Sequence, residues 1–300
     1  MDMTPIQSKI TRVNKHCVAD SFNKAAKQYN HHATVQHSIS AETVRKLEQV
    51  LSHKNSQINR NRSDWLLDIG CGTAPNLNKL EKLCNQVLAV DLAHSMLREV
   101  DIQGSQSDTT TSAVFLNNSD AEALAVKTNS IDAVYSSMAL QWCESPIKAL
   151  SEINRVLSSK GAAVVAIMLG ESFQEMHDAW HAIDKPSRVN MFHKMNIWLD
   201  ACSQFNWEYS YTKKTYLTHH QSVVDMLKSL KRIGANTKLT SCAVNDTHSL
   251  VNHASTSSNQ TYMPKQEITQ LNAYFKERFQ HDNSYPLNYD VLYLTLQKRA

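Results

Sequence analysis

The segment Trp65–Ala74 constrains the fold more than any other part of this chain of 300 residues. An apolar run typical of a buried strand ends there in the pattern Asp-x-Gly-x-Gly, and a helix-like stretch follows. Open α/β sheets build a nucleotide-sized pocket in this way, at the carboxyl end of the first strand. Gly70 and Gly72 let the backbone turn sharply and approach a ligand, because no Cβ is in the way. The pattern therefore predicts a ligand pocket at the edge of an α/β sheet.

A second strand-like run, residues 87–90, ends in Asp91, 19 positions after Gly72. An acid at the tip of the second strand is placed to accept hydrogen bonds from ribose hydroxyls. A dinucleotide fingerprint needs a third glycine, and residues 73–75 contain none. Asp68 would also repel a pyrophosphate, whereas its charge suits a ligand with an ammonium group and a sulfonium centre. These residues favour S-adenosylmethionine, with a nicotinamide cofactor as the less favoured alternative.

Composition narrows the function classes. The net charge of +3 comes without a sustained basic stripe, which argues against a nucleic-acid partner. No apolar run approaches the roughly 20 residues that span a bilayer, so no membrane partner is expected. The amino terminus lacks a signal-peptide core, and the six cysteines form no C-x-x-C pair, so reduced thiols in the cytoplasm are expected. The fourteen histidines include no H-E-x-x-H motif and no Cys/His framework, so no metal site is predicted.

Strand-like and helix-like runs alternate through the first part of the chain, which predicts a mostly parallel sheet. The expected strands are 65–70, 86–91, 113–117, 130–137, 162–169, 207–217 and 287–297. The expected helices are 74–84, 94–100, 145–157, 171–185, 190–204 and 222–233. We expect one domain, 1–300, with a cofactor-binding core at 62–170 and substrate-side helices and final strands at 171–300. The polar stretch 241–262 is expected to be a mobile loop.

Residues 18–51 predict two helices ahead of the first strand. Phe22, Ala26, Tyr29 and Ala33 recur at spacings of four, three and four, which places them on one helix face. A second apolar stripe follows Ser40, a suitable helix cap. These helices are near enough to the first strand to form a lid over its pocket, although an extra packing helix explains the pattern equally well.

Further segments match one family along most of the chain. They are 19–29, 139–143, 177–180, 229–235 and 285–289, around the glycine motif at 67–72. They resemble, in this order, the family patterns F-x-x-A-A-x-x-Y, A-V-Q-W-C, H-x-A-W, S-L-K-x-I-G-A and Y-P-L-T-Y, with Leu140 and Asn288 departing from them. With these segments the chain resembles the class I S-adenosylmethionine-dependent methyltransferases, and within them the malonyl-[acyl-carrier protein] O-methyltransferase family, which opens the pimelate branch of biotin synthesis. Ala74 and Pro75 depart from the pattern, because many relatives have a further glycine there.

The resemblance implies a seven-stranded, Rossmann-like mixed sheet with amino-terminal lid helices and extra helices after strand five. Gly70 and Gly72 would approach the methionine part of S-adenosylmethionine, Asp68 would face its ammonium side, and Asp91 would bind the ribose hydroxyls. The other implied cofactor contacts surround the adenine or close the end of strand four: Leu92, Met96, Asp120, Ala121, Ser137 and Met138. From the residues alone, Asp91 or Asp120 could instead cap a helix, and Met96 could be ordinary core.

The resemblance also implies the acceptor, which is the free carboxylate of a malonyl group carried by acyl carrier protein. Such an acid has a pKa near or below ~4, so it is already ionised and needs no general base. Its desolvation does require a donor, and Tyr29 and His32 on the lid are the candidates. Trp142 is expected to wall the methyl-transfer site. Simple packing or solvent exposure remains an alternative for each of these three residues.

Basic residues are candidates for holding the acceptor and its carrier. Arg188, Lys231 and Arg232 could bind a carboxylate or a phosphate. Basic clusters at 213–214 and 228–232 suit an acidic carrier protein, although a solvated surface is the commoner meaning of such clusters. Two other functions stay open: a small-molecule O- or C-methyltransferase of the same fold, and a non-catalytic cofactor-binding protein.

Overall fold

The computed structural model describes residues 14–28, 34–57, 63–102, 112–232, 263–279 and 284–299. These residues form a seven-stranded sheet with the strand order β3-β2-β1-β4-β5-β7-β6. Its strands are β1 (Ser63–Ile69), β2 (Cys84–Asp91), β3 (Ala113–Asn118), β4 (Ile131–Ser137), β5 (Leu157–Met168), β6 (Trp207–His220) and β7 (Tyr285–Lys298). β1 to β5 pair in parallel, and β7 runs antiparallel to both of its neighbours, β5 and β6. The predicted seven-stranded mixed α/β sheet is confirmed.

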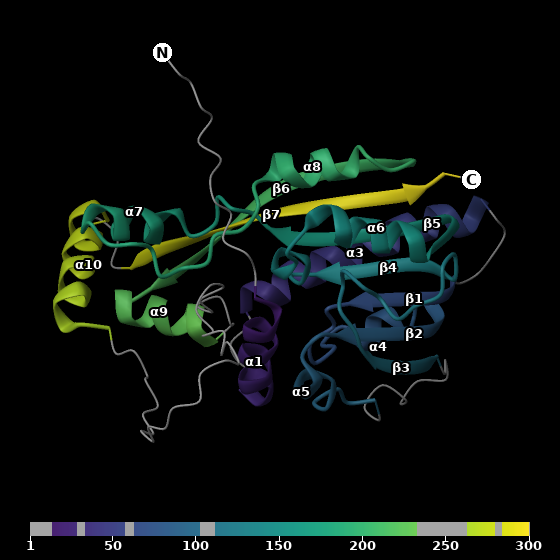
Figure 1. Ribbon diagram of the computed structural model, residues 1–300, viewed down its shortest axis with the longest axis horizontal. Coiled ribbons are helices and arrows are strands. Elements are labelled where there is room, and N and C mark those ends of the chain that lie inside the picture. The colour runs from purple at the N-terminus through teal and green to yellow at the C-terminus, as the bar shows by residue number, and fades with distance from the viewer. Residues whose placement is uncertain are drawn as a thin grey trace, which may run out of the picture.

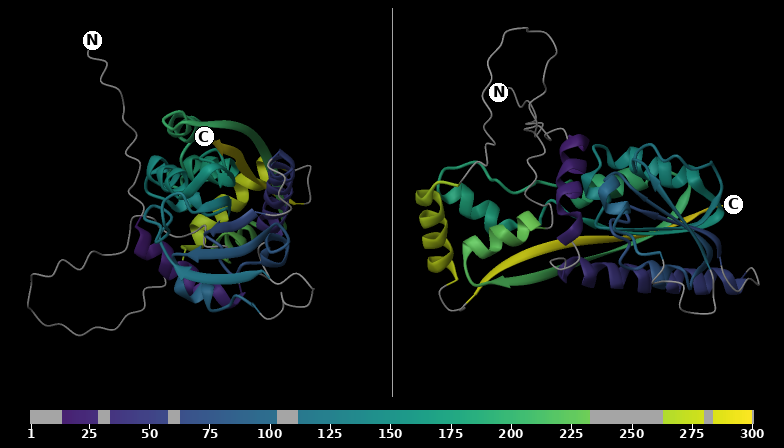
Figure 2. Two further views of the ribbon diagram at one scale, coloured as in Figure 1. Left: turned by 90° about the vertical axis from the view of Figure 1, so that its right-hand side faces the viewer. Right: turned by 90° about the horizontal axis from the view of Figure 1, so that it is seen from below.

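Helices cover both faces of the parallel strands (Figures 1 and 2). α3 (Thr34–Gln57) lies along one face, and its Val44, Leu47 and Leu51 pack on the sheet together with α4 (Leu77–Leu80). α6 (Pro146–Val156) and α8 (Met195–Cys202) cover the opposite face. The central strands are therefore buried on both sides, which explains why they read as continuous apolar runs rather than as alternating ones.

The antiparallel strands β6 and β7 extend past the parallel strands and carry a second group of helices. The two strands pair from Trp207↔Lys298 to His220↔Tyr285. α7 (Gln174–Ala182), α9 (Val223–Arg232) and α10 (Lys265–Arg278) surround their far ends (Figure 1). We call this group the substrate-side lobe, and it encloses a core with Phe173 and Phe275 at its centre. The predicted extra helices after strand five are thus present, while the expected loop at 241–262 lies outside the described residues.

α1 (Lys15–Ala25), followed by the short η1 (Ala26–Gln28), stands at the carboxyl edge of the parallel strands, between them and the substrate-side lobe (Figures 1 and 2). The Asn14 Oδ1 accepts from the backbone N–H groups of His16 and Cys17, which fixes the start of the helix. Asn23 Oδ1 accepts from Ser95 N at 2.8 Å and so ties α1 to α5 (His94–Leu97). α1 therefore has the position of the predicted lid.

Three details of the sequence prediction are wrong. Ser40 does not cap a helix, because α3 already begins at Thr34 and the Ser40 hydroxyl donates to the carbonyl of His37 within the helix. α4 is a single turn, Leu77–Leu80, rather than the predicted 74–84, and turns lie on either side of it. Cys17 is disulfide-bonded, whereas the thiols of the other described cysteines, Cys71, Cys84, Cys143 and Cys202, are free and buried.

No described helix combines the length and the apolar character that crossing a membrane would require. Within the described part of the chain, no three or more His, Cys, Asp or Glu side chains converge in a way that could hold a metal ion.

Candidate active site

A pocket lies where β1, β2 and β4 end, and α1 and the start of α3 complete its walls. The residues predicted to bind the cofactor all line it: Asp68, Gly70, Gly72, Asp91, Leu92, Met96, Asp120, Ala121, Ser137 and Met138. Trp142 lines it as well. The convergence follows from topology, since the carboxyl ends of neighbouring parallel strands meet at one edge of the sheet.

The glycine loop after β1 needs glycine at two positions for different reasons. Gly70 has a φ of +69°, and a Cβ there would lie 2.1 Å from the Cβ of Ala139. Gly72 has a φ of +57°, and a Cβ there would meet no heavy atom within 4 Å, because this residue faces the open pocket. Ala74, at the position where the family pattern has a further glycine, adopts a φ of +50°. A non-glycine residue in this left-handed region costs roughly 1–2 kcal/mol.

Asp91 ties the glycine loop to the start of α5. Its Oδ2 accepts from Gly72 N at 2.8 Å, and its Oδ1 accepts from Ala93 N at 2.7 Å. Burial raises the pKa of this carboxyl, and the two backbone N–H bonds oppose the rise. Each carboxylate oxygen keeps a further lone pair, so Asp91 can still accept from a ligand hydroxyl.

Asp68 is the most exceptional polar group in the pocket. The residue is 3% exposed, and its Oδ1 has no hydrogen-bond partner among the described residues. Burial, with the nearby Asp91 as a second cause, raises the pKa of Asp68 to about 8. A buried carboxylate without a partner is costly unless a cation completes the site. The donor set therefore fits a cationic ligand, and the ammonium and sulfonium groups of S-adenosylmethionine have this character.

The opposite end of the pocket is held by paired side chains. Lys15 Nζ lies 2.5 Å from Asp120 Oδ2 and 2.5 Å from Glu122 Oε2. Asp120 Oδ1 also accepts from Glu122 N at 2.9 Å, which closes a turn; no helix begins there, so Asp120 does not cap one. Asn118 Nδ2 donates to the carbonyl oxygens of Asp91 and Leu92. These bonds fix the residues predicted to surround the adenine.

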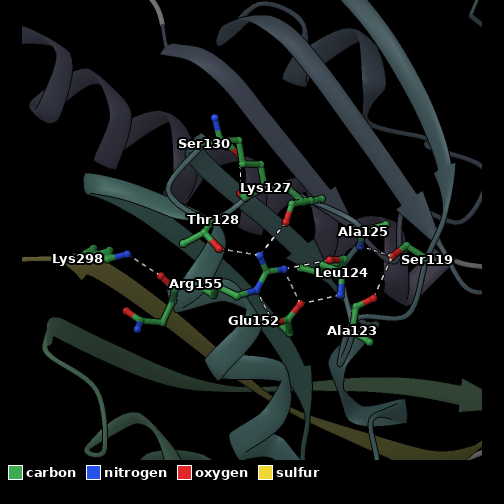
Figure 3. A network of polar contacts seen from close by, with 12 residues as sticks. Ser119, Ala123, Leu124, Ala125, Lys127, Thr128, Ser130, Glu152, Arg155 and Lys298 are labelled. Carbon is green, nitrogen blue, oxygen red and sulfur yellow. Dashed lines mark hydrogen bonds and ion pairs between the residues drawn. The ribbon is translucent and has the colours of Figure 1, made fainter.

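Arg155 and Glu152 from α6 hold the loop between β3 and β4, which begins with Ser119 and Asp120 (Figure 3). Arg155 Nη1 donates to the Val126 carbonyl at 2.7 Å, and Nη2 donates to the Leu124 carbonyl at 3.0 Å. Glu152 Oε2 accepts from Leu124 N at 2.7 Å, and its Oε1 accepts from Arg155 Nε. Side chains thus satisfy backbone groups that have no strand neighbour here.

An aromatic wall separates the pocket from the substrate-side lobe. Trp142 is 9% exposed, and its ring meets Phe22 of α1 edge to face at 5.4 Å and Phe192 at 5.5 Å. Phe192 in turn contacts Phe173 in the core of the lobe. Trp142 therefore packs against other aromatic rings and also lines the pocket, and its role at the methyl-transfer site stays a prediction.

The other predicted catalytic and substrate-binding residues do not gather at the pocket. Tyr29 and His32 lie outside the described residues. Arg188 Nη2 donates to Glu267 Oε2 at 2.7 Å, and neither Arg188 nor the exposed Lys231 lines the pocket. Arg232 ends α9, and its side chain is outside the described part.

Several residues that line the pocket were not predicted as site residues, and Lys15 and Gln36 are two of them. Lys15 pairs with Asp120, which lies 105 positions away in the sequence. No local sequence pattern predicts such a pair. Gln36 is the third residue of α3 and is 8% exposed. It lies four residues before the buried Ser40, a spacing that places both on one helix face. This spacing could have indicated that Gln36 is buried, but the helix was predicted to follow Ser40, so Gln36 was placed outside it.

Comparisons with known proteins indicate a methyltransferase, a class of enzyme whose cofactor suits the pocket. Residues 67–165 match the family described as Methyltransferase domain. The fold is similar to that of a putative methyltransferase from Bacillus halodurans, with a TM-score of 0.55 and 14% identity, covering 86% of this chain and 99% of that one. The chain is a class I methyltransferase that uses S-adenosylmethionine as its cofactor.

Curated relatives narrow the class. The chain is 29% identical to the malonyl-[acyl-carrier protein] O-methyltransferase of Alcanivorax borkumensis over 235 residues, 77% of this chain and 75% of the relative. It is 30% identical to the enzyme of the same name from Erwinia billingiae over 225 residues, 74% of this chain and 81% of the relative. The chain belongs to the malonyl-[acyl-carrier protein] O-methyltransferase family.

Proposed function

We propose that this enzyme methylates the free carboxylate of a malonyl group carried by acyl carrier protein, giving the methyl ester that primes pimeloyl and biotin synthesis. The observation that carries the proposal is the similarity to malonyl-[acyl-carrier protein] O-methyltransferases over about three quarters of the chain. The pocket supports it, because a buried carboxylate without a partner and an aromatic wall suit a cationic methyl donor beside a small acceptor.

The chemistry needs orientation rather than proton transfer. When bound, S-adenosylmethionine supplies an electrophilic methyl group: a carboxylate oxygen bonds to the methyl carbon while the carbon–sulfur bond breaks and its electron pair stays on sulfur. Because the acceptor is ionised at neutral pH, no side chain has to remove a proton. The protein contributes by holding the two reactants together and excluding water, and positioning of this kind contributes roughly 7–11 kcal/mol in favourable cases.

Roles for the pocket residues follow from their places. Asp68 and the glycine loop would hold the methionine part of the cofactor, and Asp91 would accept from the ribose hydroxyls. The remaining predicted contacts would surround the adenine or close the strand-four end, and Trp142 would wall the methyl-transfer site. Tyr29 and His32 stay proposed donors to the acceptor. The proposed domain is 1–300, with 18–51 as lid helices, 62–170 as the cofactor core and 171–300 as the substrate side.

An acidic carrier protein would dock by charge. Lys228 and Lys231 are exposed on α9 in the substrate-side lobe, beside α1 (Figure 1). Lys213 is less available, since its Nζ pairs with Asp290 Oδ2 at 3.1 Å. Rim charges of this kind mainly speed association and are screened by salt. Activity on the carrier-bound substrate should therefore fall as ionic strength rises, and more steeply than activity on malonyl-coenzyme A.

The test is transfer of labelled methyl from S-adenosylmethionine to malonyl-acyl carrier protein, with succinyl-carrier protein, malonyl-coenzyme A and free malonate in parallel. We expect labelled ester on the malonyl carrier, with little on the succinyl carrier or on free malonate. Label on free diacids or on quinones at equal rates would favour the small-molecule methyltransferase. Cofactor binding without transfer to any acceptor would favour a non-catalytic role.

A further inference from the structure

Gln36 is a buried polar residue that the protein leaves without a partner. It lines the pocket from the first turns of α3 and is 8% exposed. Across the described part of the chain, no hydrogen bond uses its carboxamide. A carboxamide has two N–H donors and one acceptor oxygen. The carboxamide of Gln36 is not fully enclosed by protein atoms, so a ligand group in the pocket that accepts hydrogen bonds can reach it.

The charges around the pocket indicate which ligand group Gln36 suits. Asp68 and Asp91 are both buried acids in the wall. Among the described lining residues Lys15 is the only lysine or arginine, and Asp120 and Glu122 already engage it. His37 lines the pocket as well. An acceptor carboxylate that enters this pocket therefore finds no unpaired ammonium or guanidinium group among the described lining residues. It needs a neutral donor.

A neutral donor also suits the reaction. A carboxylate that attacks a methyl carbon loses negative charge as the bond forms, so a bound Arg or Lys would stabilise the starting state more than the transition state. An amide N–H orients the carboxylate through a weaker bond and leaves more charge on its oxygens. The same donor discriminates between substrate and product, because the methyl ester is a poorer acceptor than the carboxylate.

We propose that the Gln36 carboxamide donates to the carboxylate of the methyl acceptor and makes the pocket selective for an ionised carboxyl group. This inference rests on the proposed function only in requiring a carboxylate acceptor. Gln36 is then an acceptor-binding residue, distinct from the residues assigned to the cofactor. The second carboxylate that enters the pocket is that of the cofactor's methionine, so a test must separate the two.

The test compares Gln36→Glu and Gln36→Leu with the wild-type enzyme and with Gln49→Glu, the same substitution at an exposed position of the same helix. Replacing the donor by a negative charge should raise KM for malonyl-acyl carrier protein by about 30-fold or more, and Gln36→Leu should raise it by about 10-fold. The dissociation constant of S-adenosylhomocysteine, measured by calorimetry, should change less than about twofold in both variants. Gln49→Glu should match the wild type in every measurement.

Weaker S-adenosylhomocysteine binding, with or without a change in the acceptor KM, would assign Gln36 to the methionine carboxylate and overturn the inference. An unchanged KM and an unchanged dissociation constant would make Gln36 a packing residue and overturn it too. Turnover by the wild type in the same assay reports on the proposed function separately. A wild-type enzyme that methylates no carboxylate would overturn that function, and the inference with it.

Discussion

The two ends of the pocket differ in how their polar groups are satisfied. At the end proposed to bind the adenine, which we call the adenine end, Asp120 and Glu122 pair with Lys15, and Arg155 with Glu152 holds the loop that carries Asp120. At the other end Asp68 keeps an oxygen without a partner, and the Gln36 carboxamide makes no hydrogen bond to the described residues. The first end is complete without a ligand, and the second is not.

This contrast between paired and unpaired polar groups indicates that the two ends contribute differently to ligand binding. Paired groups give a rigid surface that changes little when a ligand binds, so binding there costs little reorganisation. Unpaired buried groups lower stability in the free protein and return that cost as binding energy when a complementary ligand arrives. Under the proposed function the reacting atoms would lie toward the second end, where a specific partner matters most.

Replacing Asp91 and Asp120 one at a time should weaken the binding of S-adenosylhomocysteine to different extents. Asp91→Ala removes the acceptor for two backbone N–H groups as well as the proposed ribose contact, so S-adenosylhomocysteine should bind about 100-fold more weakly. Asp120→Ala should cost only about fivefold, because Lys15 already occupies one of its oxygens and keeps Glu122 as a partner. Calorimetry measures both. Equal losses would contradict the expected difference between Asp91 and Asp120.

Asp68 offers the sharpest test of the incomplete end. Its pKa is raised from 3.8 to about 8, so the stability that its protonation contributes is complete below about pH 4 and is lost as the pH rises through about 8. A cationic ligand prefers the ionised form, so affinity for S-adenosylhomocysteine should rise between about pH 6 and pH 8. Asp68→Asn should flatten that rise and weaken binding about tenfold.

The same variant should stabilise the protein without ligand. At pH 8 we expect Asp68→Asn to unfold at a higher temperature than the wild type, with a gain of roughly 1–3 kcal/mol, because it removes a buried charge that lacks a partner. Thermal unfolding with and without S-adenosylhomocysteine measures both effects. A variant that is less stable in both conditions would mean that Asp68 is already satisfied by the protein.

The residues predicted to bind the cofactor line one pocket, and the sequence could predict this because local patterns mark them. Asp68 and Asp91 each follow an apolar run, and the topology of parallel strands brings such positions together. The same holds for the residues after β3 and β4, including Asp120 and Met138.

What the sequence missed depends on contacts between distant segments or on the exact start of a helix. The pair of Lys15 with Asp120 spans 105 positions, and nothing near either residue encodes it. Gln36 was overlooked because Ser40 resembled a cap, although α3 begins six residues earlier at Thr34. Capping propensity was overridden there by packing of the longer helix on the sheet.

The smallest predicted effect concerns the support of the adenine end. Arg155→Leu leaves the carbonyl oxygens of Leu124 and Val126 without their donor and frees Glu152 from its ion pair. Because these groups are only partly buried, water replaces some of the lost bonds, and the free energy of unfolding should fall by about 1–2 kcal/mol in urea titrations. Arg45→Leu is the matched control: it also breaks an i,i+3 pair, with Glu42, but touches no backbone carbonyl and should leave stability nearly unchanged. S-adenosylhomocysteine should bind Arg155→Leu only a few-fold more weakly, since Lys15 still holds Asp120. A loss as large as that of Asp91→Ala would instead show that the loop, and not the strand ends, organises the pocket.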